Sequence, residues 1–110
     1  MSNARPVIAC GLGALSEEER ARRSAAAASV SARFREVRET PDGYTACFDP
    51  DAQLVQDAFD WVLLERRCCP FLRLELRFEP SAGPVWLHFS GGPGVKEFLG
   101  AAGFIKASPG

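Results

Sequence analysis

Residues 65–79 have the sequence Glu-Arg-Arg-Cys-Cys-Pro-Phe-Leu-Arg-Leu-Glu-Leu-Arg-Phe-Glu, which contains the end of a helix and a whole strand. From Leu72 onward, apolar and charged residues alternate strictly, and this period of two is typical of a strand with one buried face. Pro70 ends the preceding helix, because proline lacks a backbone N–H and disfavours the helical conformation in the residue before it. We therefore predict a helix up to about Cys69, followed by a half-buried strand.

The predicted central helix starts at residues 49–51, where an Asp can cap it and Pro50 is tolerated in the first turn. Glu65 lies in the middle of the apolar arc of this helix, and a carboxylate there is costly to bury unless it is neutralised, paired or bound to something. At about 100° per residue, the arc expected to face a sheet consists of Leu54, Val55, Ala58, Phe59, Trp61, Val62 and Cys69.

A second helix is predicted near the N-terminus. Ser16 and Glu19 have the spacing of a capping box, and the Ala-rich stretch after them is expected to be helical to about Ser29. An acidic run in this helix is followed by a basic one, so opposite charges lie near each other along the helix. We interpret these charges as a solvated face, and its basic members are Arg20, Arg22 and Arg23.

Two hairpins flank the central helix. In the first, strand-forming runs at residues 34–40 and 44–48 lie on either side of Asp42-Gly43, a strong hairpin signal. In the second, a turn at residues 81–83 joins the alternating strand to residues 85–89. A glycine-rich loop then leads into a short third helix.

The predicted order is α-β-β-α-β-β-α, an α+β fold in which two hairpins form one four-stranded antiparallel sheet with its helices on one face. A chain of 110 residues has the length of one domain. Residues 1–14 show no periodicity and are predicted to be a flexible N-terminal tail, with the single domain at residues 15–110. The sheet face away from the helices is expected to be either wet or a homodimer interface, because it carries Trp86, His88, Arg73 and Arg77.

Composition and motifs exclude several classes of function. The formal net charge of −1 provides no bulk field to attract nucleic acid, and no apolar run approaches the ~20 residues that a membrane helix needs. The sequence contains no Ser/His/Asp set, no paired catalytic carboxylates and no nucleotide-binding fingerprint. We therefore predict neither a nucleic-acid nor a membrane partner, and we do not favour an enzyme.

The chain has four cysteines, Cys10, Cys47, Cys68 and Cys69. Residues 7–10 match the short pattern before a lipidated cysteine, but too few residues precede them for a charged start and an apolar segment. We therefore expect the protein to lie in the reducing cytoplasm, where its cysteines are thiols rather than disulfides.

Glu65 is three residues from Cys68 and four from Cys69, so both sulfurs can approach the carboxylate on a helix. Three interpretations remain open. In the first, the cysteines fill space as small apolar residues while Glu65 pairs with an arginine such as Arg66 or with one on the sheet. In the second, they bind a soft metal ion, with Cys10 as a third ligand, Glu65 as an oxygen ligand or base, and Arg66 or Arg67 offsetting the charge. In the third, they carry thiol redox chemistry, although their spacing differs from that of a thioredoxin-type pair.

The motif at residues 65–72, with the strand at residues 85–87 and the Gly92-Pro93-Gly94-Val95-Lys96-Glu97-Phe98-Leu99 segment, resembles a small uncharacterised bacterial family. Its members have a Glu-x-x-Cys-Cys-Pro-Phe-Leu motif, a similar length and an early cysteine that Cys10 matches. Some are similar to segments associated with regulators of resistance to mercury and other heavy metals. The resemblance implies a thiol-based metal function.

The sequence thus predicts a small cytoplasmic protein that binds or buffers a thiophilic heavy-metal ion, with mercury, copper or zinc as candidates. The predicted ligands are Cys10, Cys68, Cys69 and Glu65. A non-enzymatic, homodimeric interaction module and a thiol redox protein are the alternatives.

Overall fold

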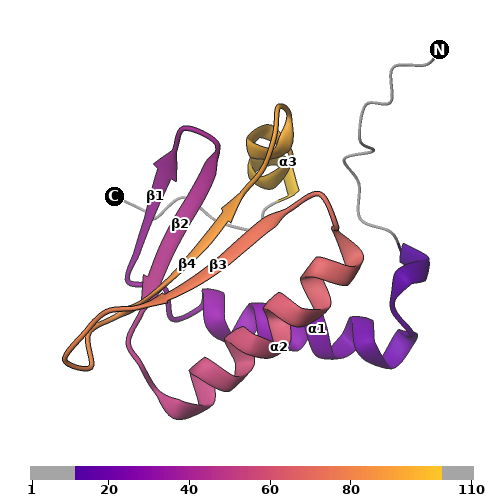
Figure 1. The fold of residues 1–110 in the computed structure, drawn as a ribbon. Helices are drawn as coiled ribbons and strands as arrows, with labels where there is room; N and C mark the ends of the chain where they lie inside the picture. The colour runs from indigo at the N-terminus through magenta and orange to yellow at the C-terminus, as the bar shows by residue number, and fades with distance from the viewer. Residues whose placement is uncertain (1–11, 103–110) are drawn as a thin grey trace.

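The computed structural model describes residues 12–102, and these form three α-helices, one 3₁₀ helix and a four-stranded antiparallel sheet (Figure 1). The predicted α+β class, the order of elements and the sheet are confirmed. In chain order the elements are η1 (Leu12–Ala14), α1 (Glu17–Ser31), β1 (Glu36–Thr40), β2 (Gly43–Phe48), α2 (Ala52–Cys68), β3 (Arg73–Phe78), β4 (Val85–Ser90) and α3 (Val95–Ala102).

Local sequence signals set the ends of the two long helices. The Ser16 hydroxyl accepts a hydrogen bond from the Glu19 N–H at 3.1 Å and the Glu19 carboxylate accepts one from the Ser16 N–H at 3.0 Å, so the predicted capping box is formed. At the start of α2, the Asp51 carboxylate accepts hydrogen bonds from two backbone N–H groups. The helix ends at Cys68, and Cys69 adopts a non-helical conformation directly before Pro70.

The sheet has the strand order β1-β2-β4-β3, so β1 and β3 lie at its two edges. The register aligns Tyr44 with Phe89 and Leu76 with Leu87, which places the apolar side chains of the sheet on one face. At the start of β2, a Cβ on Gly43 would lie 1.9 Å from the Phe89 carbonyl oxygen. Only glycine fits where these two strands come together, which explains the residue after Asp42.

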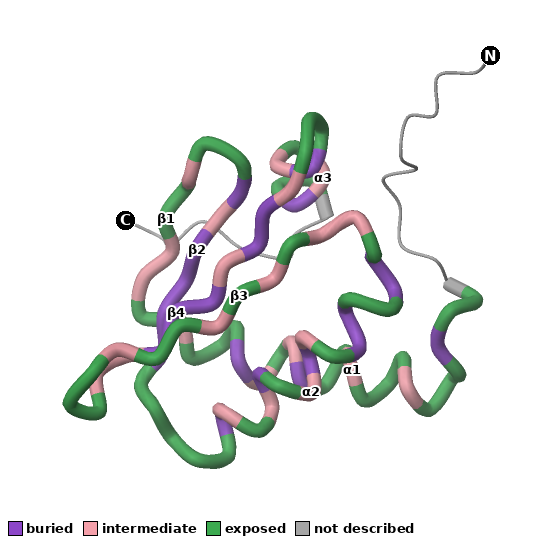
Figure 2. Tube along the Cα trace, viewed as in Figure 1, coloured by how far each residue is buried: buried purple, intermediate pink, exposed green. Residues whose placement is uncertain are grey.

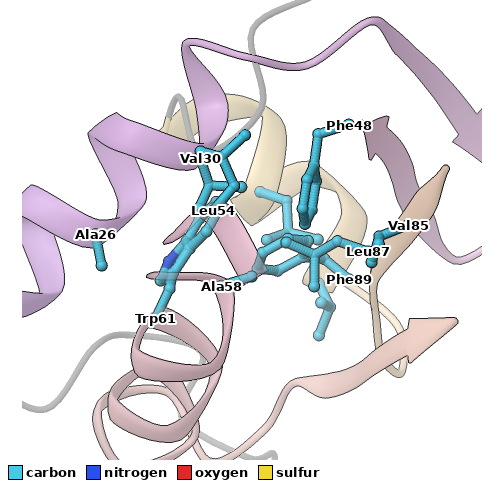
Figure 3. Packing of buried hydrophobic residues seen from close by; sticks show 11 residues of the cluster. Ala26, Val30, Phe48, Leu54, Ala58, Trp61, Val85, Leu87 and Phe89 are labelled. Carbon is cyan, nitrogen blue, oxygen red and sulfur yellow. The ribbon is translucent and has the colours of Figure 1, made fainter. Parts of the chain in front are cut away.

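The hydrophobic core lies between this face and the helices. Trp61 of α2 is at its centre, with its ring centroid 5.1 Å from that of Phe89. Figure 3 shows how sheet residues meet residues from α1 and α2 in this cluster. The main core consists of Ala26, Val30, Phe48, Leu54, Ala58, Trp61, Val85, Leu87, Phe89, Val95 and Leu99.

Helix α1 packs mainly against α2 and not against the sheet, so α2 is buried on two sides (Figure 1). This arrangement changes one expectation. Phe59 was predicted to face the sheet, but α2 turns its buried surface partly toward α1, and Phe59 is 44% exposed at the rim. It stacks there on Phe78 of β3, with ring centroids 6.4 Å apart.

The opposite face of the sheet is polar, and its central aromatic residue is covered by charged side chains. Trp86 is only 9% exposed, because the guanidinium groups of Arg38 and Arg77 lie 4.9 and 5.9 Å from the centroid of its ring. His88 is partly buried and lies 3.3 Å from the hydroxyl of Thr45 through its Nε2. None of the helices within residues 12–102 combines the length and the apolarity needed to span a lipid bilayer.

Candidate metal centre

Glu65 is the largest departure from an ordinary apolar helix face. It lies on α2, four residues after Trp61, and its side chain is fully buried at 0% exposure. Figure 2 shows that buried, intermediate and exposed residues alternate along α2. The prediction that this carboxylate faces inward is confirmed. Because a buried carboxylate needs compensation, its surroundings decide what it can do.

The two oxygens of Glu65 have different environments. Oε1 accepts hydrogen bonds from Arg23 Nε at 2.8 Å and Trp61 Nε1 at 3.1 Å, and Arg23 Nη2 lies 2.6 Å away. Oε2 is also buried, but it has no hydrogen-bond partner within the described part of the chain. A buried carboxylate oxygen without a partner is costly, and such an oxygen can accept a hydrogen bond or coordinate a cation.

Burial raises the pKa of Glu65 above its ordinary value, because removal from water penalises the charged form. The charge of Arg23 and the hydrogen bonds from Arg23 and Trp61 act in the opposite direction, and burial outweighs them. Glu65 is therefore an ion-paired carboxylate that accepts a proton more readily than an exposed one.

The two cysteines complete a compact group with this carboxylate. One carboxylate oxygen and the sulfurs of Cys68 and Cys69 all lie within 4.8 Å of one another, and all three residues are buried. With metal–sulfur bonds of about 2.3 Å, ligand atoms lie about 3.8 Å apart around a tetrahedral ion and about 4.6 Å apart across a linear one. The group therefore has the size of a metal site.

The cysteines differ in chemical state. Cys68 and Cys47 carry thiols, as predicted, whereas Cys69 is disulfide-bonded. The expectation that all four cysteines are thiols is therefore wrong for Cys69. Cys10, the predicted third ligand, lies outside the described residues. Burial raises the pKa of Cys47, which lies on the opposite face of the sheet and does not belong to the group.

The two sulfurs belong to a second, smaller hydrophobic cluster, whose apolar side chains cover them. It consists of Leu15, Leu64, Cys68 and Cys69, with Phe71 and Leu72 packed against it. Leu15, in the link between η1 and α1, is 4% exposed, and Cys68 retains 6% exposure. These apolar side chains therefore restrict the access of a ligand to the sulfurs.

Arg67 holds this cover in place. Its Nη1 donates to Glu19 at 2.7 Å and its Nη2 donates to the carbonyl of Ala14 at 3.1 Å. Arg66 and Arg67 were predicted to offset charge at the cysteines, but Arg66 is exposed and Arg67 points to the start of α1. The Arg67 guanidinium is also the main reason that the pKa of Glu19 falls to about 2.

The residue that neutralises Glu65 was missed in the sequence. Arg23 was assigned to a solvated face, but its side chain is only 20% exposed and crosses from α1 to α2. The signal was its spacing, because Arg23 lies three and seven residues before Ala26 and Val30, the buried residues of α1. Trp61 could have been found in the same way, since it lies one turn before Glu65.

The glycine-rich loop before α3 does not form a comparable site. It borders an open hollow of about 430 Å³ together with Pro41 and Asp42. Asp42 and Glu97 contribute acidic groups to the same hollow as Lys96, which disfavours an anion, and Lys96 already forms an ion pair with Glu39 at 2.9 Å. The strand-to-helix turn accounts for these glycines.

The carboxylate–cysteine group at the end of α2 is therefore the strongest candidate site in residues 12–102. Comparisons of the chain with protein-family models, with curated proteins and with solved structures find no match.

Proposed function

We propose that the reduced protein binds one thiophilic metal ion through Cys68, Cys69 and Glu65. The observation that carries this proposal is the buried, unpartnered Oε2 of a carboxylate that lies within 4.8 Å of two cysteine sulfurs. A purely structural cluster has no need of such an oxygen, because an apolar residue would fill the space at lower cost. A bound cation would supply its partner.

The donor set indicates which ions fit. Thiolates prefer soft or borderline ions such as Hg(II), Cu(I) and Zn(II). Two thiolates and one carboxylate carry three negative charges, and Arg23 supplies one positive charge at the carboxylate. A divalent ion then makes the site neutral, whereas Cu(I) leaves a negative charge in a buried place, so we favour Hg(II) and Zn(II). The resemblance to a bacterial family linked to mercury resistance supports the same choice.

Binding depends on the redox state of Cys69. A sulfur in a disulfide is not a thiolate ligand, so the disulfide and the metal compete for Cys69. A reducing cytoplasm, the compartment expected from the sequence, would favour the metal-binding form. Cys10 is proposed as a further ligand of that form. With Cys68 and Cys69 alone, Glu65 would coordinate the ion as a carboxylate; with Cys10 bound as a third thiolate, Glu65 would instead keep the thiol proton, and a divalent ion still makes the site neutral.

Titration of the full reduced chain with Hg(II), Zn(II) or Cu(I), after anaerobic removal of the reductant, tests the proposal. We expect one equivalent of Hg(II) to remove two or three reactive thiols and to raise the melting temperature, since an ion that binds the folded state stabilises it. The Cys68→Ser/Cys69→Ser variant should lose both effects, and Cys47→Ser, the matched control, should keep them. Unchanged tight binding by the double variant, or no tight binding by the parent, would overturn the proposal.

The Glu65→Gln variant distinguishes metal binding at the site from simple reaction of the two thiols with the metal. It keeps the shape of the side chain but removes its charge, so we expect weaker metal binding with both thiols still present. Comparison of Zn(II) affinities by competition with a chelator gives the measurement. Equal affinities in the parent and the variant would show that Glu65 does not contribute to the site.

A thiol redox function is the second candidate, and the disulfide at Cys69 beside the Cys68 thiol favours it. This function requires one of the two thiols of the reduced protein to react with an alkylating agent well below pH 8.5, the usual pKa of a free thiol. If both thiols react with the alkylating agent at the pH of an ordinary free thiol, the redox function is excluded and the metal proposal is unaffected.

A further inference from the structure

Strand β3 lies at an edge of the sheet and pairs with β4 on one side (Figure 1). The large hydrophobic side chains that are exposed in residues 12–102 gather along it. Phe78 of β3 is 51% exposed and stacks on Phe59 of α2, which is 44% exposed. Leu63, one helical turn after Phe59, is 56% exposed. An edge strand beside exposed apolar side chains is a natural site for pairing with another strand.

The sequence of this edge is complementary to itself. Residues 73–79 are Arg-Leu-Glu-Leu-Arg-Phe-Glu, with the charged residues on the face away from the helices and the apolar ones on the helix face. If two copies of β3 pair antiparallel with Leu76 opposite Leu76, then Glu75 lies opposite Arg77 and Arg73 lies opposite Glu79. On the other face, Leu74 lies opposite Phe78. Every cross-strand pair then joins opposite charges or apolar groups.

The neighbouring registers do not share this property. Outward-pointing N–H and C=O groups alternate along an antiparallel strand, so an allowed shift moves the pairing by an even number of residues. Centring the pair on Glu75 places Glu75 opposite itself and Arg73 opposite Arg77. Centring it on Arg77 places Arg77 opposite itself and Glu75 opposite Glu79. Both shifts bring like charges together. Centring on Leu74 or on Phe78 leaves only one distinct pair of opposite charges, against two in the Leu76-centred register, so the charges favour the Leu76-centred register.

We propose that a second copy of this chain docks on β3 in the Leu76-centred register and joins the two sheets into one of eight strands across a twofold axis. The same axis brings the α2 helices of the two copies near each other along the edge, where Phe59 and Leu63 can be covered. This interface differs from one centred on Trp86, which Arg38 and Arg77 cover within one copy. It does not depend on the metal proposal.

Charge reversal tests the register directly, with the mass of the full chain measured by light scattering and sedimentation under reducing conditions. The parent is expected to be a dimer. Glu75→Arg and Arg77→Glu each turn two symmetry-related pairs into like charges, so each should raise the dissociation constant by about tenfold or more. An equimolar mixture of the two variants should form a heterodimer, and the Glu75→Arg/Arg77→Glu double variant should dimerise again.

Arg33→Glu is the matched control for Arg77→Glu, because it makes the same change of charge at an exposed position between α1 and β1 and should leave the dimer intact. Circular dichroism checks that each variant is folded, and the mixture checks it independently, since unfolded chains cannot restore each other. A monomeric parent overturns the proposal. Single reversals that dimerise like the parent, or a mixture that stays monomeric while the parent is a dimer, also overturn it.

Discussion

The two hydrophobic clusters of this protein differ in what their buried atoms require. In the main core, side chains from the sheet and all three helices are apolar, and packing alone accounts for their burial. The smaller cluster at the end of α2 encloses two sulfurs and lies next to a carboxylate with an unpartnered oxygen. Packing therefore accounts for the first cluster, whereas the second leaves a buried polar atom that packing does not satisfy, which is the basis of the proposed metal site.

Trp61 belongs to both regions. Its ring packs against Phe89 in the main core, and its N–H donates to Glu65 beside the cysteines. The carboxylate is therefore held by a side chain whose position the core fixes. This rigid support is what a preorganised binding site needs.

Truncation of one side chain in each cluster should give the largest contrast. Phe48→Ala in the main core, where Phe48 is fully buried, should lower the free energy of unfolding by about 3–5 kcal/mol, the cost of a large cavity. Cys68→Ala should lower it by less than about 2 kcal/mol. Urea unfolding of the reduced protein measures both. Equal losses would show that the smaller cluster is an ordinary part of the core.

Removal of Arg23 tests whether Glu65 is an ion-paired buried charge. Arg23→Ala should cost about 3 kcal/mol near neutral pH, because it leaves a buried carboxylate without its counter-charge. Burial already raises the pKa of Glu65 in the folded state above its ordinary value of 4.5. Between the ordinary pKa of the unfolded state and the raised pKa of the folded state, the folded state binds more protons. The free energy of unfolding therefore falls as the pH rises through that range.

The loss caused by Arg23→Ala should therefore shrink below pH 4.5, where Glu65 is protonated in both states. The Arg23→Ala/Glu65→Gln double variant is the control, since it has no carboxylate to titrate at this position. Urea unfolding across the pH range gives the comparison. A loss that is the same at acid and neutral pH would mean that Arg23 acts through packing alone.

The smallest effect on stability is expected from Arg67→Ala, which loosens the cover over the sulfurs. Its clearest effect should be faster alkylation of Cys68 in the folded, reduced protein, because Ala14 and Glu19 lose their contact with Arg67. Arg66→Ala, at an exposed neighbouring position, should leave the rate unchanged. Equal rates for both variants would show that Arg67 does not control access.

The same variant should raise the pKa of Glu19 from about 2 toward its ordinary value of 4.5, which carboxyl NMR can follow. The sign follows from the lowered pKa. The stabilisation from Glu19 is present above its unfolded value and is lost as the pH falls toward about 2. The variant should therefore lack this part of the acid sensitivity of the parent.

The elements of the fold could be predicted because each depends on a few adjacent residues. The capping box at Ser16, the Asp42-Gly43 turn and Pro70 after the cysteines mark boundaries that lie where the sequence indicates. The packing of the helices could not be predicted in the same way. The position of α1 on α2 depends on contacts between segments far apart in the chain, and this position decides that Phe59 is exposed.

Only the part of the candidate site that lies on one helix, α2, could be predicted from the sequence. Glu65, Cys68 and Cys69 are one turn apart on α2, so their proximity follows from helical geometry. The partner of Glu65 comes from another helix, and the sequence favoured Arg66 or the sheet where the structure has Arg23. Arginine side chains are long and can pair inward or outward, so their local charge pattern does not decide their role.

Helix α1 is tied to α2 at three levels, by Arg67 with Glu19, by Arg23 with Glu65 and by Ser29 with Asp57. Its own buried side chains, Ala26 and Val30, are smaller than the leucine, phenylalanine and tryptophan side chains of the main core, so α1 buries less apolar area per residue than the other elements of the core. Local unfolding of this one helix would hydrate the carboxylate and uncover the sulfurs in a single motion. Entry of an ion would then depend on the opening of α1, and Arg23 would return to the carboxylate when the helix closes.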